Sequence, residues 1–311
     1  MDLSVVIPVY DEEKNIEPLY RQLTSVLNKL GKSYEIIFID DGSKDATFGK
    51  IRKLHEKDKR VKCIRFIKNF GQTAAFNAGL HRAKGNVIIT MDGDLQNDPS
   101  DIPKLLSKMK EGYDVVSGWR FDRKDPIGKR IPSRFQNWLA KRWTGLNIHD
   151  LGCSLKAYSK ESVSGIELFG EMHRYVAAIV AMNGYSVGEV KVKHHLRKFG
   201  RTKYGLKRLL KGFLDLAYIK FWSDYSTRPL HLFGLIGIAL LAFGFILGLA
   251  KVVSDMITVG TTYVTPLILL SALCMILGIQ FITFGFLGEI QVRTYYKTAK
   301  ETNYKIKETL E

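Results

Sequence analysis

Two aspartates one residue apart, Asp92 and Asp94, stand directly after an apolar run in the motif MDGDLQNDP. Carboxylates separated by a glycine can hold a hard divalent cation through oxygen, and Gln96 adds a neutral oxygen two residues on. Such a cation, Mg²⁺ or Mn²⁺, would keep its other positions for water and a substrate phosphate. Taken alone, the motif is also typical of an ordinary turn, because Asp and Gly favour turns. Its interpretation as a metal site therefore depends on its surroundings.

The elements around this motif alternate between short β-rich runs and helical stretches with apolar residues three and four apart. Strands are predicted at residues 3–8, 34–39, 61–65, 87–91 and 114–117, and helices at residues 15–29, 45–55, 73–83 and 101–110. This order predicts an α/β fold, with a mostly parallel sheet and helices on both faces. In such sheets ligands bind beyond the carboxyl ends of the strands.

Acidic residues mark three of these predicted strand ends. The first strand ends at Pro8 and is followed by Tyr10 and Glu12. The second is followed by Asp40 and Asp41, and the fourth by Asp92. Like charges gathered on one rim need a cation, which favours the metal-site interpretation. For Asp40 and Asp41 the alternative is capping of the next helix, but Ser43 and Asp45 are closer to that helix.

The charge of the chain points to an anionic partner. Lys and Arg number 47 against 31 Asp and Glu, a net charge of +16. Nucleic acid, a lipid surface or a phosphorylated substrate would each fit this balance. The three cysteines (Cys63, Cys153 and Cys274) have no paired or metal-type spacing, which predicts reduced thiols facing a cytosol.

Two long stretches, residues 232–250 and 261–288, contain no charged residue. A spanning helix needs about 20 apolar residues, so membrane helices are predicted at residues 230–253 and 263–288. Buried core helices are the alternative. Lys and Arg follow the second stretch and are missing from residues 252–262, so both termini are predicted to be cytoplasmic. Four glycines in the first stretch indicate close helix packing, which would also allow a homo-oligomer: Gly234, Gly237, Gly244 and Gly248.

Two basic regions, residues 134–144 and 204–229, precede these stretches. In the second, Leu206, Leu210 and Phe213 share one helical face while Lys207 and Lys211 share another. This pattern is typical of a helix lying in the membrane interface, and an ordinary surface helix is the alternative. Because the basic residues flank apolar segments, a lipid partner is favoured and a nucleic-acid partner is not.

Four segments in this order resemble the inverting family 2 glycosyltransferases: SVVIPVYDEEKNI, IIFIDDGSKDAT, MDGDLQNDP and DLGCSLKAY. The most similar branch is the polyprenyl-phosphate glycosyltransferases, akin to dolichol-phosphate mannose synthase and bacterial bactoprenol glucosyltransferases. The resemblance covers about residues 2–205. It implies a Rossmann-like GT-A fold, a nucleotide-sugar donor and a polyprenyl phosphate acceptor such as undecaprenyl phosphate. UDP-glucose is the first expectation for the donor, with GDP-mannose and UDP-N-acetylglucosamine left open.

The resemblance also implies roles for the residues at the strand ends. By this correspondence Pro8, Tyr10 and Glu12 line the nucleotide, Asp40 and Asp41 hold the base and ribose, and Asp92, Asp94 and Gln96 match the metal site that bridges the diphosphate. A divalent cation there would neutralise charge growing on the leaving group.

The segment DLGCSLK begins with Asp150, where the family has a catalytic aspartate. It could act as base, orient the acceptor or stabilise positive charge on the sugar, and a turn aspartate is the alternative. Some related sequences have Glu before this residue, whereas His149 stands here. Four basic residues resemble acceptor-phosphate positions: Arg120, Arg134, Arg197 and Lys203, with Arg120 and Arg134 favoured and also assigned to catalysis. Attraction to lipid headgroups is the competing explanation.

The predicted organisation is a catalytic domain over residues 1–203, an interfacial helix and linker over 204–229, the two spans, and a basic cytoplasmic tail over 289–311. The expected protein moves one sugar to a polyprenyl phosphate at the bacterial inner membrane. A processive polysaccharide synthase is one rival, although the chain lacks Gln-x-x-Arg-Trp and two spans suit an anchor better than a pore. A non-catalytic membrane protein that binds nucleotide-sugars is the other.

Overall fold

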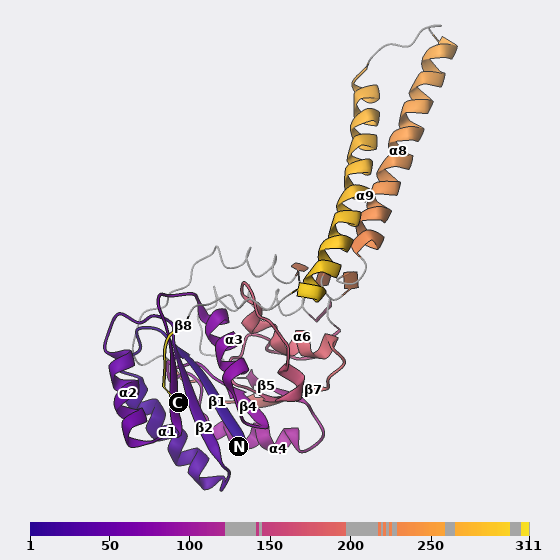
Figure 1. Cartoon of the computed structure of the whole chain (residues 1–311). Helices are drawn as coiled ribbons and strands as arrows, with labels where there is room; N and C mark the ends of the chain where they lie inside the picture. Colours follow the sequence, from indigo (N-terminus) through magenta and orange to yellow (C-terminus); the bar gives the residue numbers. More distant parts are fainter. Residues whose placement is uncertain are drawn as a thin grey trace. The chain divides into compact units, whose positions relative to one another are not determined.

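The computed structural model describes residues 1–121, 141–142, 145–196, 217–218, 220–221, 224–225, 229–258, 265–298 and 306–310. The chain divides into two compact units, Met1–Ile219 with Thr302–Glu311 and Lys220–Glu301 (Figure 1). The predicted interfacial helices at residues 134–144 and 204–229 lie outside the described residues, apart from short helical pieces.

The first unit is built on an eight-stranded sheet with the order β7-β5-β6-β4-β1-β2-β3-β8. Parallel pairing joins β4, β1, β2 and β3 in that order and also joins β5 to β7, whereas β6 and β8 run antiparallel to their neighbours. The strands are β1 (Leu3–Val9), β2 (Tyr34–Asp40), β3 (Val61–Phe66), β4 (Val87–Thr90), β5 (Val115–Arg120), β6 (Lys156–Ser159), β7 (Val187–Val192) and β8 (Ile306–Leu310).

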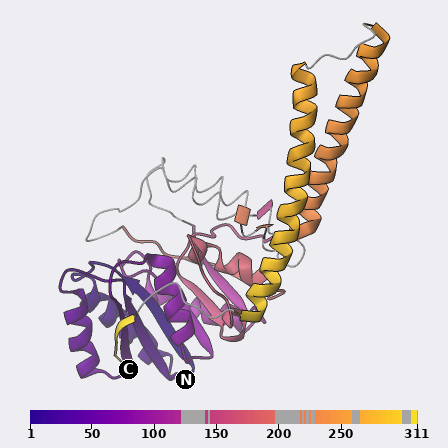
Figure 2. The same ribbon diagram turned by 45° about the horizontal axis from the view of Figure 1, so that its top comes forward.

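Helices cover both faces of this sheet, and Figure 2 shows the two layers from a second direction. One core layer contains α1 (Ile16–Lys29), α2 (Thr47–Lys57) and α4 (Ile102–Met109), and the other contains α3 (Gln72–Arg82) and α6 (Val176–Met182). Consecutive residues of a strand point to opposite faces, so Val5 and Ile7 pack in the first layer and Val6 in the second. The predicted α/β fold is confirmed, and all three cysteines are free and buried.

The carboxyl-terminal segment differs from its prediction as a basic tail. The second apolar helix continues to Thr298, and Ile306–Leu310 then forms β8 against β3 at the edge of the sheet. Edge strands leave backbone N–H and C=O groups unpaired, and an added strand satisfies them. The segment is short and rich in charge, so its sequence pattern did not indicate a strand.

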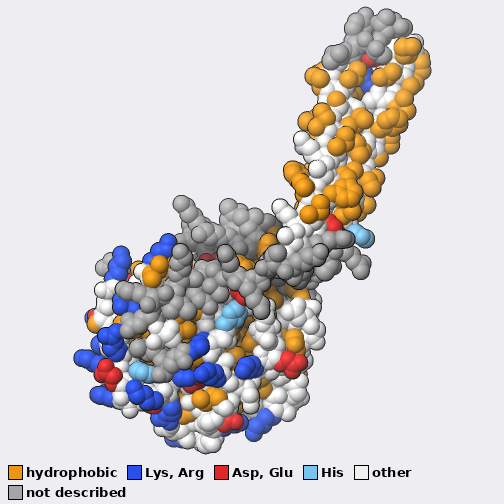
Figure 3. Space-filling view, viewed as in Figure 1, with side chains coloured by type: hydrophobic (Ala, Val, Ile, Leu, Met, Phe, Trp, Pro, Cys, Tyr) orange, Lys and Arg blue, Asp and Glu red, His pale blue; other side chains and the backbone are white. Residues whose placement is uncertain are grey.

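The second unit contains two apolar helices, α8 (Pro229–Thr258) and α9 (Pro266–Thr298), both longer than predicted. Pro229–Thr258 and Pro266–Gln291 are long and apolar enough to cross a membrane, and the mean hydropathy of an 18-residue stretch reaches 2.6 in the first and 2.4 in the second. Apolar side chains cover their surface (Figure 3). Gly237, Gly244 and Gly248 of α8 pack against α9, and a Cβ on Gly237 would lie 2.6 Å from the carbonyl oxygen of Gly278. Close packing is therefore confirmed, but α9 occupies that face, and the homo-oligomer stays a prediction.

Candidate active site

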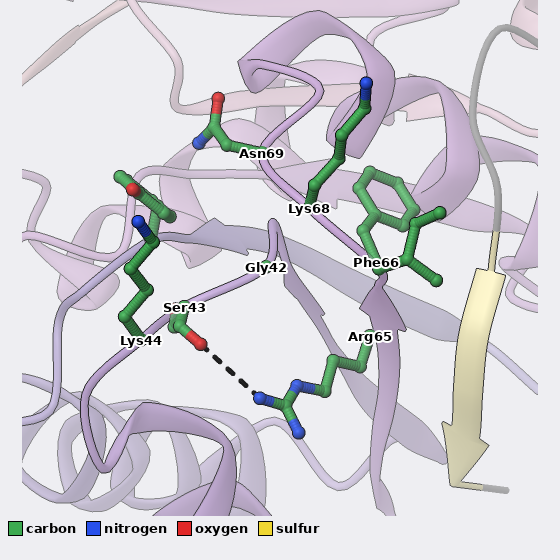
Figure 4. A pocket seen from close by; sticks show the side chains of 9 residues that line it. Gly42, Ser43, Lys44, Arg65, Phe66, Lys68 and Asn69 are labelled. Atoms are coloured by element: carbon green, nitrogen blue, oxygen red, sulfur yellow. Dashed lines mark hydrogen bonds between the residues drawn. The ribbon is translucent and has the colours of Figure 1, made fainter.

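A pocket of about 370 Å³ opens at the carboxyl ends of β1, β2 and β3 (Figure 4). Its lining residues are Tyr10, Gly42, Ser43, Lys44, Arg65, Phe66, Ile67, Lys68 and Asn69. Gly42 has a φ of +73°, and a Cβ there would lie 2.4 Å from the backbone carbon of Lys68, so only glycine fits this turn. Of the residues predicted to bind the nucleotide, Tyr10 lines the pocket directly. The contribution of β3 was not predicted.

The loops after β1 and β2 are joined by hydrogen bonds that shape one side of this pocket. The amide of Asp11 donates to the Ser43 hydroxyl at 3.0 Å, and the amide of Lys44 donates to the Asp11 carboxylate at 2.9 Å. The amide of Glu12 donates to the hydroxyl of Thr47 at 2.9 Å. Pro8 lies within β1, paired with Ile39 of β2. The predicted residues of β1 and β2 therefore come together at one end of the sheet.

Asp40 and Asp41 do not line the pocket themselves, and Asp40 contacts two residues that do, Ser43 and Arg65. Asp40 is fully buried, accepts a hydrogen bond from the amide of Ser43 at 2.9 Å and lies 3.2 Å from the Nε of Arg65. Burial raises the pKa of Asp40, against the opposing effects of the Ser43 hydrogen bonds and the Arg65 charge. The guanidinium of Arg65 therefore supplies the positive charge that a buried carboxylate requires.

Asp41 connects β2 to the start of α3. Its two carboxylate oxygens accept hydrogen bonds from the amides of Phe70 at 2.6 Å and Gly71 at 2.9 Å. The amide of Thr47 at the start of α2 is instead bound by Asp45 at 2.9 Å. Asp45, and neither Asp40 nor Asp41, therefore binds this amide of α2, and the predicted role of Asp40 and Asp41 in nucleotide binding stays a prediction.

The acidic turn after β4 is held from three sides. Asp92 accepts hydrogen bonds from the side chains of Gln72 at 2.7 Å and Ser154 at 2.6 Å. Its own amide donates to the side chain of Asn97 at 3.0 Å. A Cβ on Gly93 would lie 2.6 Å from Val9, so glycine is needed where the turn crosses the end of β1. These contacts fix Asp92, while neither Gln72 nor Ser154 was predicted from the sequence.

Asp94 and Gln96 complete the predicted oxygen donors of this turn. Asp94 is buried and accepts a hydrogen bond from the amide of Gln96 at 3.1 Å. Within the described part of the chain, no group of three His, Cys, Asp or Glu side chains is arranged to hold a metal alone. Two carboxylates and an amide oxygen nevertheless fit Mg²⁺ or Mn²⁺, because these ions retain positions for water and substrate phosphates.

Asp150 and Arg120 form a buried ion pair at the end of β5. The Nε of Arg120 lies 2.7 Å from one carboxylate oxygen of Asp150, and its Nη2 lies 2.9 Å from the other. Burial lowers the pKa of Arg120, but the hydrogen bonds and charge of Asp150 outweigh it and raise that pKa. The planar fork that would suit a phosphate is thus engaged by Asp150. The structure brings together two residues that the sequence placed in separate motifs.

The segment after Asp150 links this ion pair to the acidic turn. Ser154 donates to Asp92, and its carbonyl oxygen accepts a hydrogen bond from Thr90 at 2.7 Å. Lys156 is fully buried and donates to the carbonyl oxygens of Leu151 and Cys153. Burial lowers the pKa of Lys156 to about 8. Arg134, Arg197 and Lys203 lie outside the described residues, so their predicted contacts stay predictions.

The sequence and the fold both match a known family of enzymes. Residues 4–166 match glycosyl transferase family 2. The fold, with its pocket and acidic turn at the carboxyl ends of the strands, is that of the GT-A class. The chain belongs to glycosyl transferase family 2.

The relatives extend over nearly the whole chain. Dodecaprenyl-phosphate galacturonate synthase of Rhizobium johnstonii is 37% identical over 99% of this chain and 93% of its own length. Undecaprenyl-phosphate 4-deoxy-4-formamido-L-arabinose transferase of Shewanella sediminis is 34% identical over 99% of this chain and 92% of its own. The protein is therefore a membrane glycosyltransferase related to polyprenyl-phosphate sugar transferases.

A solved structure shares the fold at much lower identity. Glucosyl-3-phosphoglycerate synthase from Mycobacterium tuberculosis, in complex with Mn²⁺ and UDP-glucose, superposes with a TM-score of 0.54 at 17% identity. The match covers 71% of this chain and 78% of that one. This likeness confirms the GT-A architecture.

Proposed function

We propose that the protein transfers a single sugar from a nucleoside diphosphate sugar to a polyprenyl phosphate, with inversion and with a divalent cation. The observation that carries the proposal is identity of 37% to a polyprenyl-phosphate sugar synthase over 99% of the chain, both apolar helices included. The pocket beside β3 would take the nucleotide. Asp92, Asp94 and Gln96 would hold the cation, which would neutralise charge on the diphosphate.

The reaction needs one bond formed and one broken at the same carbon. An oxygen of the acceptor phosphate attacks the anomeric carbon, and the bond from that carbon to the diphosphate oxygen breaks with its electron pair. Attack from the opposite face inverts the configuration. The acceptor phosphate is already ionised near neutral pH, so the reaction has little need of Asp150 as a base. We assign to Asp150 the orientation of Arg120, which would meet the incoming phosphate through Nη1, because Asp150 binds its Nε and Nη2.

The donor sugar is the finer part of the proposal. UDP-glucose was the expectation from the sequence, whereas the names of the relatives give galacturonate and 4-deoxy-4-formamido-L-arabinose. These names favour a modified sugar over glucose. Membranes containing the protein should be incubated with undecaprenyl phosphate and a panel of labelled nucleotide-sugars that includes UDP-glucose, UDP-galacturonate and UDP-4-deoxy-4-formamido-L-arabinose. One of these should label the lipid, and labelling with none would overturn the proposal.

Two variants make this assay specific. Asp94→Asn removes one predicted cation ligand and should abolish transfer with either Mg²⁺ or Mn²⁺. Glu111→Gln changes an exposed carboxylate and should leave transfer intact. A product containing one sugar per lipid excludes the processive synthase, and a polymer would favour it. Donor binding without turnover in the wild type would favour the non-catalytic rival.

We also propose that both termini face the cytoplasm of a bacterial inner membrane. Support comes from β8, which follows α9 and pairs with β3 in the same unit as the amino terminus. A folded unit lies on one side of a bilayer, so two crossings would return the chain to the side that it left. Lys and Arg after the uncharged stretch of residues 261–288 favour the cytoplasm. A cysteine placed at exposed Ser33 should react with an impermeant maleimide only in inverted vesicles, and labelling in intact spheroplasts would reverse the orientation.

A further inference from the structure

One carboxylate from β7 binds the backbone at the site of the predicted catalytic aspartate. An oxygen of Glu189 accepts hydrogen bonds from the amides of His149 at 2.9 Å and Asp150 at 3.0 Å. Its other oxygen lies 2.7 Å from Nδ1 of His149. An ionised carboxylate only accepts, so Nδ1 of His149 carries the hydrogen in this contact. Glu189 thus binds three N–H groups of two consecutive residues.

The strands beneath this contact explain how Glu189 arrives there. β7 runs parallel to β5, and Glu189 pairs in register with Ser117, three residues before Arg120. The side chain of Glu189 is 11% exposed, so its charge is largely removed from water. A carboxylate in such a position requires hydrogen-bond donors, and the two amides with the imidazole supply them.

The ring of His149 is fixed from its other side by Trp119. Their ring centroids are 4.1 Å apart with an interplanar angle of 12°. Trp119 precedes Arg120 on β5, and Arg120 binds the carboxylate of Asp150 through two nitrogens. The backbone of Asp150 is therefore held by β7 while its side chain is held by β5.

We propose that Glu189 is a positioning residue for the transfer reaction, which acts by fixing the backbone of Asp150 so that its carboxylate orients Arg120. This inference rests on the proposed function. Without Glu189, the exposed amide of His149 and the partly buried amide of Asp150 lose their acceptor, and the His149–Asp150 segment relaxes. Displacement of a reacting group by about 1 Å can cost about 100-fold in rate. The donor pocket is formed by β1, β2 and β3, so donor binding should change little.

Steady-state kinetics on the full-length enzyme tests the inference. Glu189→Ala should lower kcat about 100-fold while the donor KM changes less than about threefold. Glu189→Gln keeps an oxygen toward the two amides and should recover at least about tenfold of that loss. Glu35→Gln is the matched control, because Glu35 is a buried carboxylate at the amino end of β2 and should leave kcat unchanged. A Glu189→Ala enzyme with wild-type kcat would refute the positioning role.

Hydrogen–deuterium exchange gives a readout that needs no substrate. In Glu189→Ala the amides of His149 and Asp150 should exchange at least about tenfold faster, with the α1 and α3 amides unchanged. Unchanged exchange at His149 and Asp150 would also overturn the inference. If the wild type transfers no sugar, the proposed function fails, whereas the exchange result still decides whether Glu189 holds this segment.

Discussion

The ion pair between Arg120 and Asp150 allows a quantitative test of how the site is held together. Both side chains are largely buried, with 13% and 7% exposed, and two charge-assisted hydrogen bonds of 2.7 and 2.9 Å join them. Removal of one partner leaves the other as an unpaired buried charge, which costs about 3–5 kcal/mol. Arg120→Met and Asp150→Asn should therefore each destabilise the catalytic unit by about 3 kcal/mol.

The double variant measures the interaction between Arg120 and Asp150 apart from the contacts that each makes with the rest of the protein. If the two losses were independent, their sum would be about 6 kcal/mol. The second substitution removes a charge that already lacks its partner, so we expect a total of about 3–4 kcal/mol. The coupling free energy should then be about 2–3 kcal/mol.

Pulse proteolysis of the detergent-solubilised full chain in a urea series measures these unfolding free energies. The control pair is Lys108 and Glu111, whose side chains are 30% and 55% exposed, so its coupling should stay below about 1 kcal/mol. Transfer rates of the two Arg120 and Asp150 single variants and of the double variant should fall to a similar level, because the residues act as a unit. Additive unfolding free energies within about 0.5 kcal/mol would refute the reasoning.

Three further predictions concern the rim and the far end of the sheet. Gly42→Ala should raise the donor KM and destabilise the unit by about 1–3 kcal/mol, because the turn has positive φ and a Cβ would meet the backbone of Lys68. Donor titration measures the KM, and urea unfolding measures the stability. Unchanged values of both would contradict the structure. Gln72→Ala should weaken cation binding, because Asp92 would lose one of the groups that hold it, and the Mn²⁺ concentration for half-maximal transfer should rise. An unchanged metal titration would show that Gln72 does not position Asp92. Burial raises the pKa of Glu35, but hydrogen bonds from Ser4, Lys62 and Lys84 outweigh it and lower that pKa below 4.5. Its stabilisation is therefore complete above pH 4.5 and is lost as the pH falls further, so Glu35→Gln should flatten the acid limb of an unfolding curve; an unaltered acid limb would refute this.

The parallel half of the sheet could be predicted because its sequence pattern is local. The strand predicted at residues 34–39 contains the apolar run of residues 36–39, and the strand that forms, Tyr34–Asp40, differs from the prediction by one residue. Strands β6 and β7 were not predicted. Lys156 begins β6 and Glu189 and Lys191 interrupt β7, so neither segment reads as an apolar run. Glu189 and Lys191 contact residues far along the chain, whereas Lys156 donates to carbonyl oxygens only five and three residues away.

The candidate site could be predicted as a set of acids but not as a set of contacts. Parallel strands bring their carboxyl ends to one rim, so Asp40 and Asp92 follow from topology alone. The partners of these acids, Arg65, Gln72 and Ser154, come from other segments, and no local pattern marks them. Sequence spacing gives the position of a carboxylate and does not give the group that compensates its charge.

These compensating contacts constrain how substrates can bind. Asp40 is paired with Arg65, Asp150 with Arg120, and Asp92 accepts two side-chain hydrogen bonds, so these acids are held in place before any ligand arrives. Preorganised groups need little rearrangement when charge develops during the reaction. A diphosphate and an acceptor phosphate nevertheless add several negative charges to a rim whose two described arginines already have acidic partners. Lys44 and Lys68, which line the pocket, supply part of the compensating positive charge, and the proposed cation at Asp94 and further basic residues would supply the rest. This requirement makes Arg134, Arg197 and Lys203 the next residues to test for acceptor binding.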